Sequence, residues 1–183
     1  MKPVRVGLCI GFLLAAGQVV HAQEKARFEQ PILITSAGQS ADVTLASSLC
    51  KKVNLDAKAV AQATVPDLKG FKTLILVPGF SSKGLGAAGT SREQEMERVK
   101  KIIDGAKEMK IPVLVLHIGG KSRRGTQSDD FNRIAAEAAR HLMVVKQGDE
   151  DGFFTKIAGE KNIGIDVVDK IASLMTPLEA AFK

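Results

Sequence analysis

The feature that most constrains this chain is a pair of uninterrupted apolar runs, at residues 73–77 and 111–116, each followed by a glycine-rich loop and a longer segment of helical spacing. Such runs are typical of strands that helices cover on both faces, as in a parallel sheet. Further short runs at residues 31–35, 142–145 and 163–168 alternate with helical patterns. The alternation predicts an α/β fold, a three-layer sandwich with a mainly parallel sheet of Rossmann or flavodoxin-like kind.

The helical segments begin at recognisable caps. Ser40 is the expected N-cap of a helix that ends near Lys52, and Thr90 with Glu93 matches a capping box for the next helix. The polar face of that second helix is predicted to be solvated surface rather than a site, and it carries Arg92, Glu95, Arg98, Lys101 and Glu108. The remaining expected elements are an edge strand at 57–63, a helix opening at Ser128 or Asp129, a short helix at 153–160 and a terminal helix at 171–182.

The N-terminus has the pattern of a secretory signal peptide over residues 1–22. Lys2 and Arg5 supply the positive start, residues 6–17 form an apolar run too short to span a bilayer, and residues 20–22 are a small-residue cleavage site. Residues 23–30 are then a flexible tether, and residues 31–183 a single α/β domain. We therefore expect a periplasmic or secreted protein with no integral membrane segment after cleavage.

Composition narrows the partners that the cleaved chain can bind. Loss of Lys2 and Arg5 lowers the basic residues from 26 to 24 against 20 acidic ones, a net charge of +4, and the chain has no Trp and no Tyr. Single-stranded nucleic acid usually stacks on aromatic side chains, so nucleic acid is not an expected partner. Cys9 is lost with the signal, and the remaining Cys50 is expected to be buried rather than catalytic.

Four loops rich in glycine and polar residues follow the predicted strands, at residues 36–40, 79–89, 117–125 and 147–152. In an open parallel sheet such loops gather at the carboxyl edge, where ligands bind. Because Lys83, Arg123 and Arg124 lie in two of these loops, and helix N-termini add partial positive charge, we expect a small anionic ligand. The residues predicted to bind it are Ser36, Gly38, Gln39, Ser40, Ser81, Ser82, Lys83, Gly84, Gly86, His117, Gly119, Arg123 and Arg124.

Three alternatives to anion binding stay open. The arginines could instead pair with carboxylates of neighbouring loops, namely Asp129, Asp130, Asp149 or Asp151. Residues 79–83 resemble a nucleophile elbow except at Lys83, which stands where a glycine is needed, so a hydrolase would use Ser81 or Ser82 with His117 as its base. The third alternative is an interaction module whose protein partner covers this edge. His141 precedes a strand at the opposite edge and is expected to be structural.

No cofactor is expected, because each motif match fails in its context. Residues 84–89 satisfy G-x-G-x-x-G, but they do not follow the strand directly, because residues 80–83 intervene, and no acidic residue ends the next strand. Residues 119–122 end like a P-loop, but Val115 stands where its first glycine is required. The acidic turn at residues 149–151 has oxygen ligands suited to a hard cation, yet such turns are common and we predict no metal site.

Three motifs resemble those of a family of small secreted bacterial domains of unknown function. They are SAGQSAD at residues 36–42, SKGLGAAG at residues 82–89, and HIGG followed by RRG within residues 117–125. The likeness covers nearly the whole chain after the predicted cleavage point. It implies that the three loops belong together, and it supplies no activity.

Overall fold

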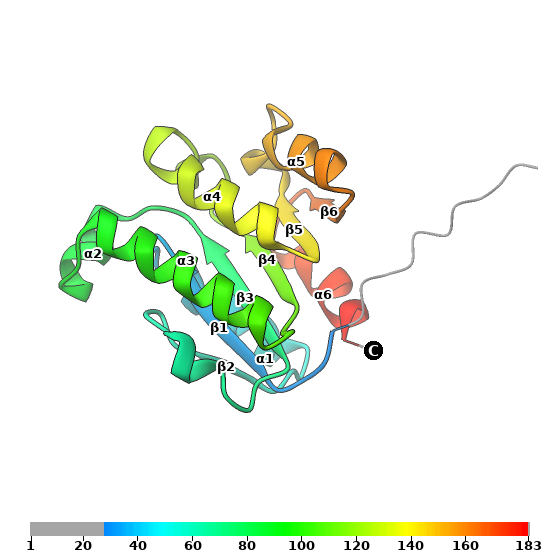
Figure 1. The fold of residues 1–183 in the computed structure, drawn as a ribbon. Coiled ribbons are helices and arrows are strands. Elements are labelled where there is room, and N and C mark those ends of the chain that lie inside the picture. The colour runs from blue at the N-terminus through cyan, green and yellow to red at the C-terminus, as the bar shows by residue number, and fades with distance from the viewer. Residues whose placement is uncertain (1–27, 183) are drawn as a thin grey trace, which may run out of the picture.

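The six strands of this protein form one parallel sheet in a computed structural model that describes residues 28–182. The order across the sheet is β2-β1-β3-β4-β5-β6 (Figure 1). The strands are β1 (Ile32–Ala37), β2 (Ala57–Ala59), β3 (Thr73–Pro78), β4 (Val113–His117), β5 (His141–Val145) and β6 (Gly164–Val168). All six were predicted from the sequence, with β2 shorter than expected.

The direction of strand addition reverses between β1 and β3. This is the flavodoxin-like order with a sixth strand added at one side, so the predicted α/β class is confirmed and the Rossmann order is not the one adopted. The strands β1 and β3 pair in register from Ile32 opposite Thr73 to Ala37 opposite Pro78. The two loops that follow these strands therefore start side by side at the carboxyl edge of the sheet.

Helices cover both faces of the sheet, which gives the predicted three layers (Figure 1). One core packs under α3 (Arg92–Glu108), α4 (Thr126–Ala138) and α5 (Phe153–Lys161), and the other under α1 (Asp42–Lys52) and α6 (Met175–Ala181). Alternate residues of a strand face opposite cores, as Leu33 and Ile34 do in β1. Cys50 lies in the second core, where burial raises the pKa of its thiol to about 11, and the prediction of a buried cysteine is confirmed.

Several local boundaries differ from the prediction. Residues 79–89 are not one loop, because α2 (Ser82–Ala88) occupies most of them, with Gly89 ending the helix at φ 63°. The capping box of α3 uses Ser91 and Gln94 rather than Thr90 and Glu93. The expected terminal helix is divided into a 3₁₀ turn, η4 (Ile171–Leu174), and α6. Three further 3₁₀ turns are η1 (Val65–Leu68), η2 (Gly120–Arg123) and η3 (Lys146–Gly148).

The predicted signal peptide and residues 23–27 of the predicted tether lie outside the described residues. The end of that segment is anchored rather than free, because Phe28 is buried and donates its backbone N–H to the carbonyl of Ala181 at 2.8 Å. The rings of Phe28 and Phe182 lie with their centroids 5.6 Å apart. None of the helices within residues 28–182 combines the length and the apolar character that a membrane span requires.

Candidate functional site

The loops after β1 and β3 pack directly against each other at the carboxyl edge. Gly79 donates its backbone N–H to the carbonyl of Ala37 at 2.9 Å, and Ser81 donates to the carbonyl of Gly38 at 2.8 Å. Gly38 has φ 111°, and a Cβ at that position would lie 2.6 Å from the Gly79 carbonyl oxygen. Gly38 is therefore required for the close approach of the two loops.

Two of the predicted site residues, Ser81 and Gly84, have structural contacts at the start of α2. Ser81 is the N-cap, and its hydroxyl oxygen accepts the backbone N–H of Gly84 at 3.1 Å. A Cβ on Gly84 would lie 1.8 Å from the carbonyl oxygen of Gln39, so this glycine also permits a backbone contact. Ser82, Lys83 and Gly86 are exposed on the helix surface.

A buried carboxylate supports the β1 loop from below. Glu95, on α3, is 1% exposed and accepts the backbone N–H of Gly38 at 2.9 Å and the side-chain amide of Gln39 at 3.0 Å. Gln39 itself has φ 60° and is buried. Because one carboxylate binds two successive residues of the loop, it fixes the loop in this unusual backbone conformation.

Arg98 neutralises Glu95 and extends the same network. Its guanidinium donates two hydrogen bonds to the carboxylate, each at 2.8 Å, and a third to the carbonyl of Ala63 at 2.7 Å. The prediction of a solvated face was therefore wrong at these two residues. Glu95 continues the buried stripe of Val99 and Ile102 at helical spacing, a signal in the sequence that identifies its position as inward-facing.

Arg123 occupies the place where the strand order reverses. It comes from η2, after β4, and its Nε donates to the Asp42 carboxylate at 3.2 Å while its Nη1 donates to the carbonyl of Phe80 at 3.2 Å. Its side chain packs closely on two glycines. A Cβ on Gly79 would lie 2.9 Å from the Arg123 Cδ, and a Cβ on Gly119 would lie 2.0 Å from the Arg123 Cγ. Arg123 thus packs against the loops after β1 and β3, at the switch point where open α/β sheets bind ligands, and its side chain stays 26% exposed.

The backbone of Arg123 is held as firmly as its side chain. Its carbonyl oxygen accepts hydrogen bonds from Nε2 of His117 at 3.3 Å and from the side-chain amide of Asn132 at 2.9 Å. A carbonyl oxygen only accepts, so Nε2 carries the imidazole proton. Asn132, fully buried on α4, is a supporting residue that the sequence analysis missed.

Arg124 points the other way and is fully engaged in ion pairs. Its guanidinium binds Asp129 at 2.8 Å and Asp151 at 2.9 Å, and it lies 4.3 Å from the ring centroid of Phe153. Its hydrogen bonds to Asp151 raise the pKa of Arg124 and lower that of Asp151 to about 2. The predicted alternative of pairing between loops is confirmed for Arg124, whereas Arg123 pairs with Asp42, which was not among the acids considered.

His117 is fully buried at the end of β4. Its ring centroid lies 4.6 Å from that of Phe154, and a Cβ on Gly148 would come within 2.4 Å of the ring. Burial lowers the pKa of His117 to about 4, so the ring is neutral near pH 7. Within residues 28–182 its Nδ1 has no hydrogen-bond partner and neither Ser81 nor Ser82 contacts the ring nitrogens, so the structure does not assemble the predicted serine–histidine pair.

The remaining predicted residues are placed in the same loops. Ser36 and Ser40 are buried, and the Ser40 hydroxyl accepts the backbone N–H of Asp42 at 3.3 Å.

Asp149, in the predicted acidic turn, accepts the backbone N–H of Phe154 at 2.6 Å in the first turn of α5. Residues 28–182 contain no group of three or more side chains able to hold a metal ion. At the opposite edge, His141 binds Asp166 at 2.9 Å, consistent with a structural role.

The chain belongs to the family described as Domain of unknown function (DUF6305), whose profile matches residues 29–182. Comparison with curated proteins gave no match. Among solved structures, the chain is similar to a mutant of the esterase AlinE4, with 11% identity, 86% of this chain and 85% of that chain covered, and a TM-score of 0.31. It is also similar to a GDSL-like lipase from Bacteroides thetaiotaomicron, with 8% identity, coverage of 74% and 66%, and a TM-score of 0.34. Likeness at this level assigns no activity to the chain.

Proposed function

We propose that this member of the DUF6305 family binds a small anion at the carboxyl edge of its sheet, with Arg123 as the principal ligand. The observation that carries the proposal is the position of Arg123, partly exposed at the switch point of the sheet and in contact with the loops after β1 and β3. There its Nε and Nη1 are bonded, while its Nη2 makes no hydrogen bond within residues 28–182. A guanidinium with a free donor and partial exposure is suited to a carboxylate or phosphate oxygen.

The two neighbouring arginines differ in what they can offer an anion. Arg124 is 12% exposed and is neutralised by two carboxylates, so its charge supports the fold. Arg123 has one carboxylate partner, Asp42, at the longer distance of 3.2 Å. Lys83 is exposed at the start of α2, three residues after Phe80, and has no ion pair among the described residues, so it adds a second positive charge to the segment after β3. The anion therefore competes with Asp42 for Arg123.

Competition with Asp42 gives the proposal a test with two opposite outcomes. Calorimetric titration with acetate, succinate, phosphate and sulfate would first identify the anion class. Arg123→Gln should then lower the affinity at least about tenfold, because a charge-assisted hydrogen bond is lost. Asp42→Asn should raise it, because the internal competitor is removed. Lys161→Gln, which removes an exposed cation at the far end of α5 and outside the proposed site, is the matched control and should change nothing.

Thermal unfolding provides an independent measurement of the same binding. An anion at about a hundredfold its dissociation constant adds about 2.7 kcal/mol to the free energy of unfolding, worth roughly 5–11 °C for a chain of this length. If no anion shifts the unfolding temperature, or if Arg123→Gln binds as tightly as the unchanged protein, the proposal fails. A protein that instead co-purifies stoichiometrically and masks Arg123 would support the interaction-module alternative.

We also propose that the protein works in the periplasm or outside the cell. The support is the sequence pattern of residues 1–22 described above, with its positive start, apolar run and small-residue cleavage site. Mass spectrometry of the protein purified from the producing cell should then find a chain that begins at Gln23. An intact N-terminus at Met1 on the cytoplasmic protein would overturn this assignment.

A further inference from the structure

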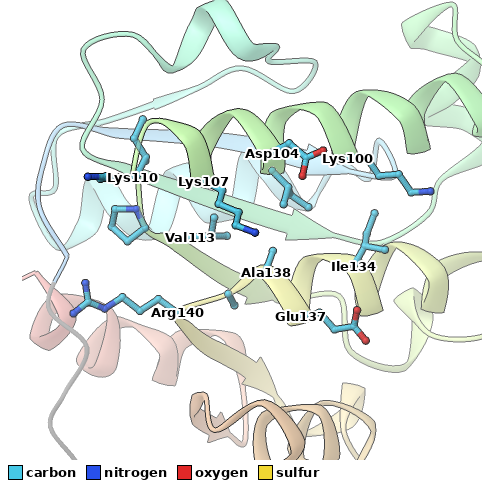
Figure 2. A pocket seen from close by; sticks show the side chains of 13 residues that line it. Lys100, Asp104, Lys107, Lys110, Val113, Ile134, Glu137, Ala138 and Arg140 are labelled. Carbon is cyan, nitrogen blue, oxygen red and sulfur yellow. The ribbon is translucent and has the colours of Figure 1, made fainter.

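A groove of about 790 Å³ opens at the amino edge of the sheet, opposite the site proposed above. It lies between α3 and α4, where the chain enters β4 (Figure 2). Its apolar lining includes Ile103 from α3, Val113 from β4, and Ile134 with Ala138 from α4. We refer to it as the amino-edge groove. Its volume lies in the range usual for small-molecule sites, which combine an apolar lining with a few polar groups.

The lining of the amino-edge groove is positively charged. Four cationic residues contribute to it, Lys100, Lys107, Lys110 and Arg140, against two acidic ones, Asp104 and Glu137. No ion pair of the four cationic residues is found in the described part of the chain, whereas Glu137 lies 3.9 Å from Arg133. Figure 2 shows Lys107 extending from α3 across the space toward α4. The groove thus joins an apolar floor to cationic groups that lack a protein partner.

We propose that the amino-edge groove is a second ligand site, which takes an amphiphilic anion: an apolar chain or ring bearing one carboxylate or phosphate head. The apolar floor can bury the apolar chain or ring of this ligand, and the unpaired Lys107 and Arg140 can bind its carboxylate or phosphate. A small inorganic anion would leave the floor exposed to water, and an apolar molecule without charge would leave the cations unused. The combination of floor and rim selects a molecule that carries both parts.

This site is independent of the one at the carboxyl edge. Val113 at the groove begins β4, and His117 beneath Arg123 ends it. Four residue steps along a strand separate the two ends by about 13 Å. Loss of Arg123 should therefore leave binding in the groove unchanged, so failure of one proposal is distinguishable from failure of the other.

The test uses the purified protein and decanoate below the concentration at which it forms micelles. Amide shifts followed by NMR should move for Ile103, Val113 and Ala138, whereas acetate should leave them in place. Decyltrimethylammonium, with the same chain and the opposite charge, should bind at least about fivefold more weakly if the rim contributes as expected of partly exposed charges.

Variants then separate a built site from general affinity for apolar chains. Lys107→Gln with Arg140→Gln should weaken decanoate about fivefold or more, whereas Lys101→Gln with Lys146→Gln, exposed lysines outside the groove, should not. Arg123→Gln should also bind decanoate normally. Equal binding of the two decyl compounds, or unchanged binding in the Lys107 and Arg140 double variant, would overturn the proposal. So would amide shifts confined to another surface.

Discussion

Helix α3 carries an acidic and a basic residue three positions apart in each of its halves, and the two pairs have different fates. Near the carboxyl edge, Glu95 and Arg98 are 1% and 13% exposed and bind each other at 2.8 Å. Near the amino edge, Asp104 and Lys107 are exposed, line a groove and form no ion pair within residues 28–182. Identical spacing on one helix therefore produces a structural network at one end and an open polar rim at the other.

The difference follows from what packs on each half of the helix. The first half covers the β1 loop, whose backbone N–H at Gly38 and side chain at Gln39 need an acceptor away from water. The second half lies beside α4, where Ile134 and Ala138 leave space instead of hydrogen-bonding groups. Clustered charge at a sheet edge consequently indicates internal support as readily as a ligand site, and unpaired charge is the better guide to binding.

The largest expected effect comes from removing the buried carboxylate. Glu95→Ala leaves Arg98 charged without its partner and leaves the Gly38 N–H unbonded, so it should lower the free energy of unfolding by about 3–5 kcal/mol. Denaturant unfolding at pH 7 measures the change. Asp104→Ala on the same helix is the matched control and should change the free energy of unfolding by less than about 0.5 kcal/mol. Similar losses in both variants would erase the contrast between the two halves of α3.

The sequence predicted the framework of the fold because apolar runs and helical spacing are local signals. All six strands, the parallel sheet and the three layers were predicted from these patterns. The prediction that residues 79–89 form a loop was wrong, because a Ser81 cap and a left-handed Gly89 suffice to make residues between them helical despite two glycines. Glycine content alone does not distinguish a loop from a short capped helix.

The candidate site was predicted less well, because its roles depend on tertiary contacts. Sequence placed Arg123 and Arg124 together in one loop, but adjacent side chains point in different directions, one to Asp42 and one to Asp129 and Asp151. Asp42 lies 81 positions from Arg123 in the chain, and no local pattern links them. The inward position of Glu95 was readable from its spacing to Val99, whereas the loop that it supports was not.

The buried His117 makes the stability of the carboxyl edge depend on pH. Its pKa is lowered from 6.5 to about 4 by burial, so the unfolded chain binds a proton that the folded chain excludes. Its contribution to stability is complete above about pH 6.5 and is lost as the pH falls toward 4. The full loss corresponds to about 3 kcal/mol in the free energy of unfolding.

Denaturant unfolding at pH 7, 5.5 and 4 isolates this contribution when the protein is compared with His117→Gln. Carboxylates titrate in both proteins and cancel in the difference, provided that the variant keeps the fold. The free energy of unfolding of the unchanged protein minus that of His117→Gln should therefore decrease as the pH falls from 7 to 4. A constant difference would mean that water reaches His117, and that the carboxyl edge is more open than its packing indicates.

The smallest expected effect separates two glycines that were predicted to serve the same purpose. A Cβ at Gly84 would lie 1.8 Å from the Gln39 carbonyl oxygen, so Gly84→Ala must push the β1 loop and α2 apart, at a cost of about 1–3 kcal/mol. A Cβ at Gly86 meets no atom within 4 Å, and Gly86→Ala in α2 should stabilise the protein by about 0.5–1 kcal/mol. Denaturant unfolding of the two variants measures the difference in stability.

Anion titration of the same two variants measures their effect on binding. Gly84→Ala should weaken the binding of the anion at Arg123, because the β1 and β3 loops no longer meet in the same register, while Gly86→Ala should bind the anion as before. If Gly86→Ala instead abolished binding without loss of stability, backbone access at α2 would be the role of this glycine, and the anion would lie over the helix rather than at Arg123 beside Asp42.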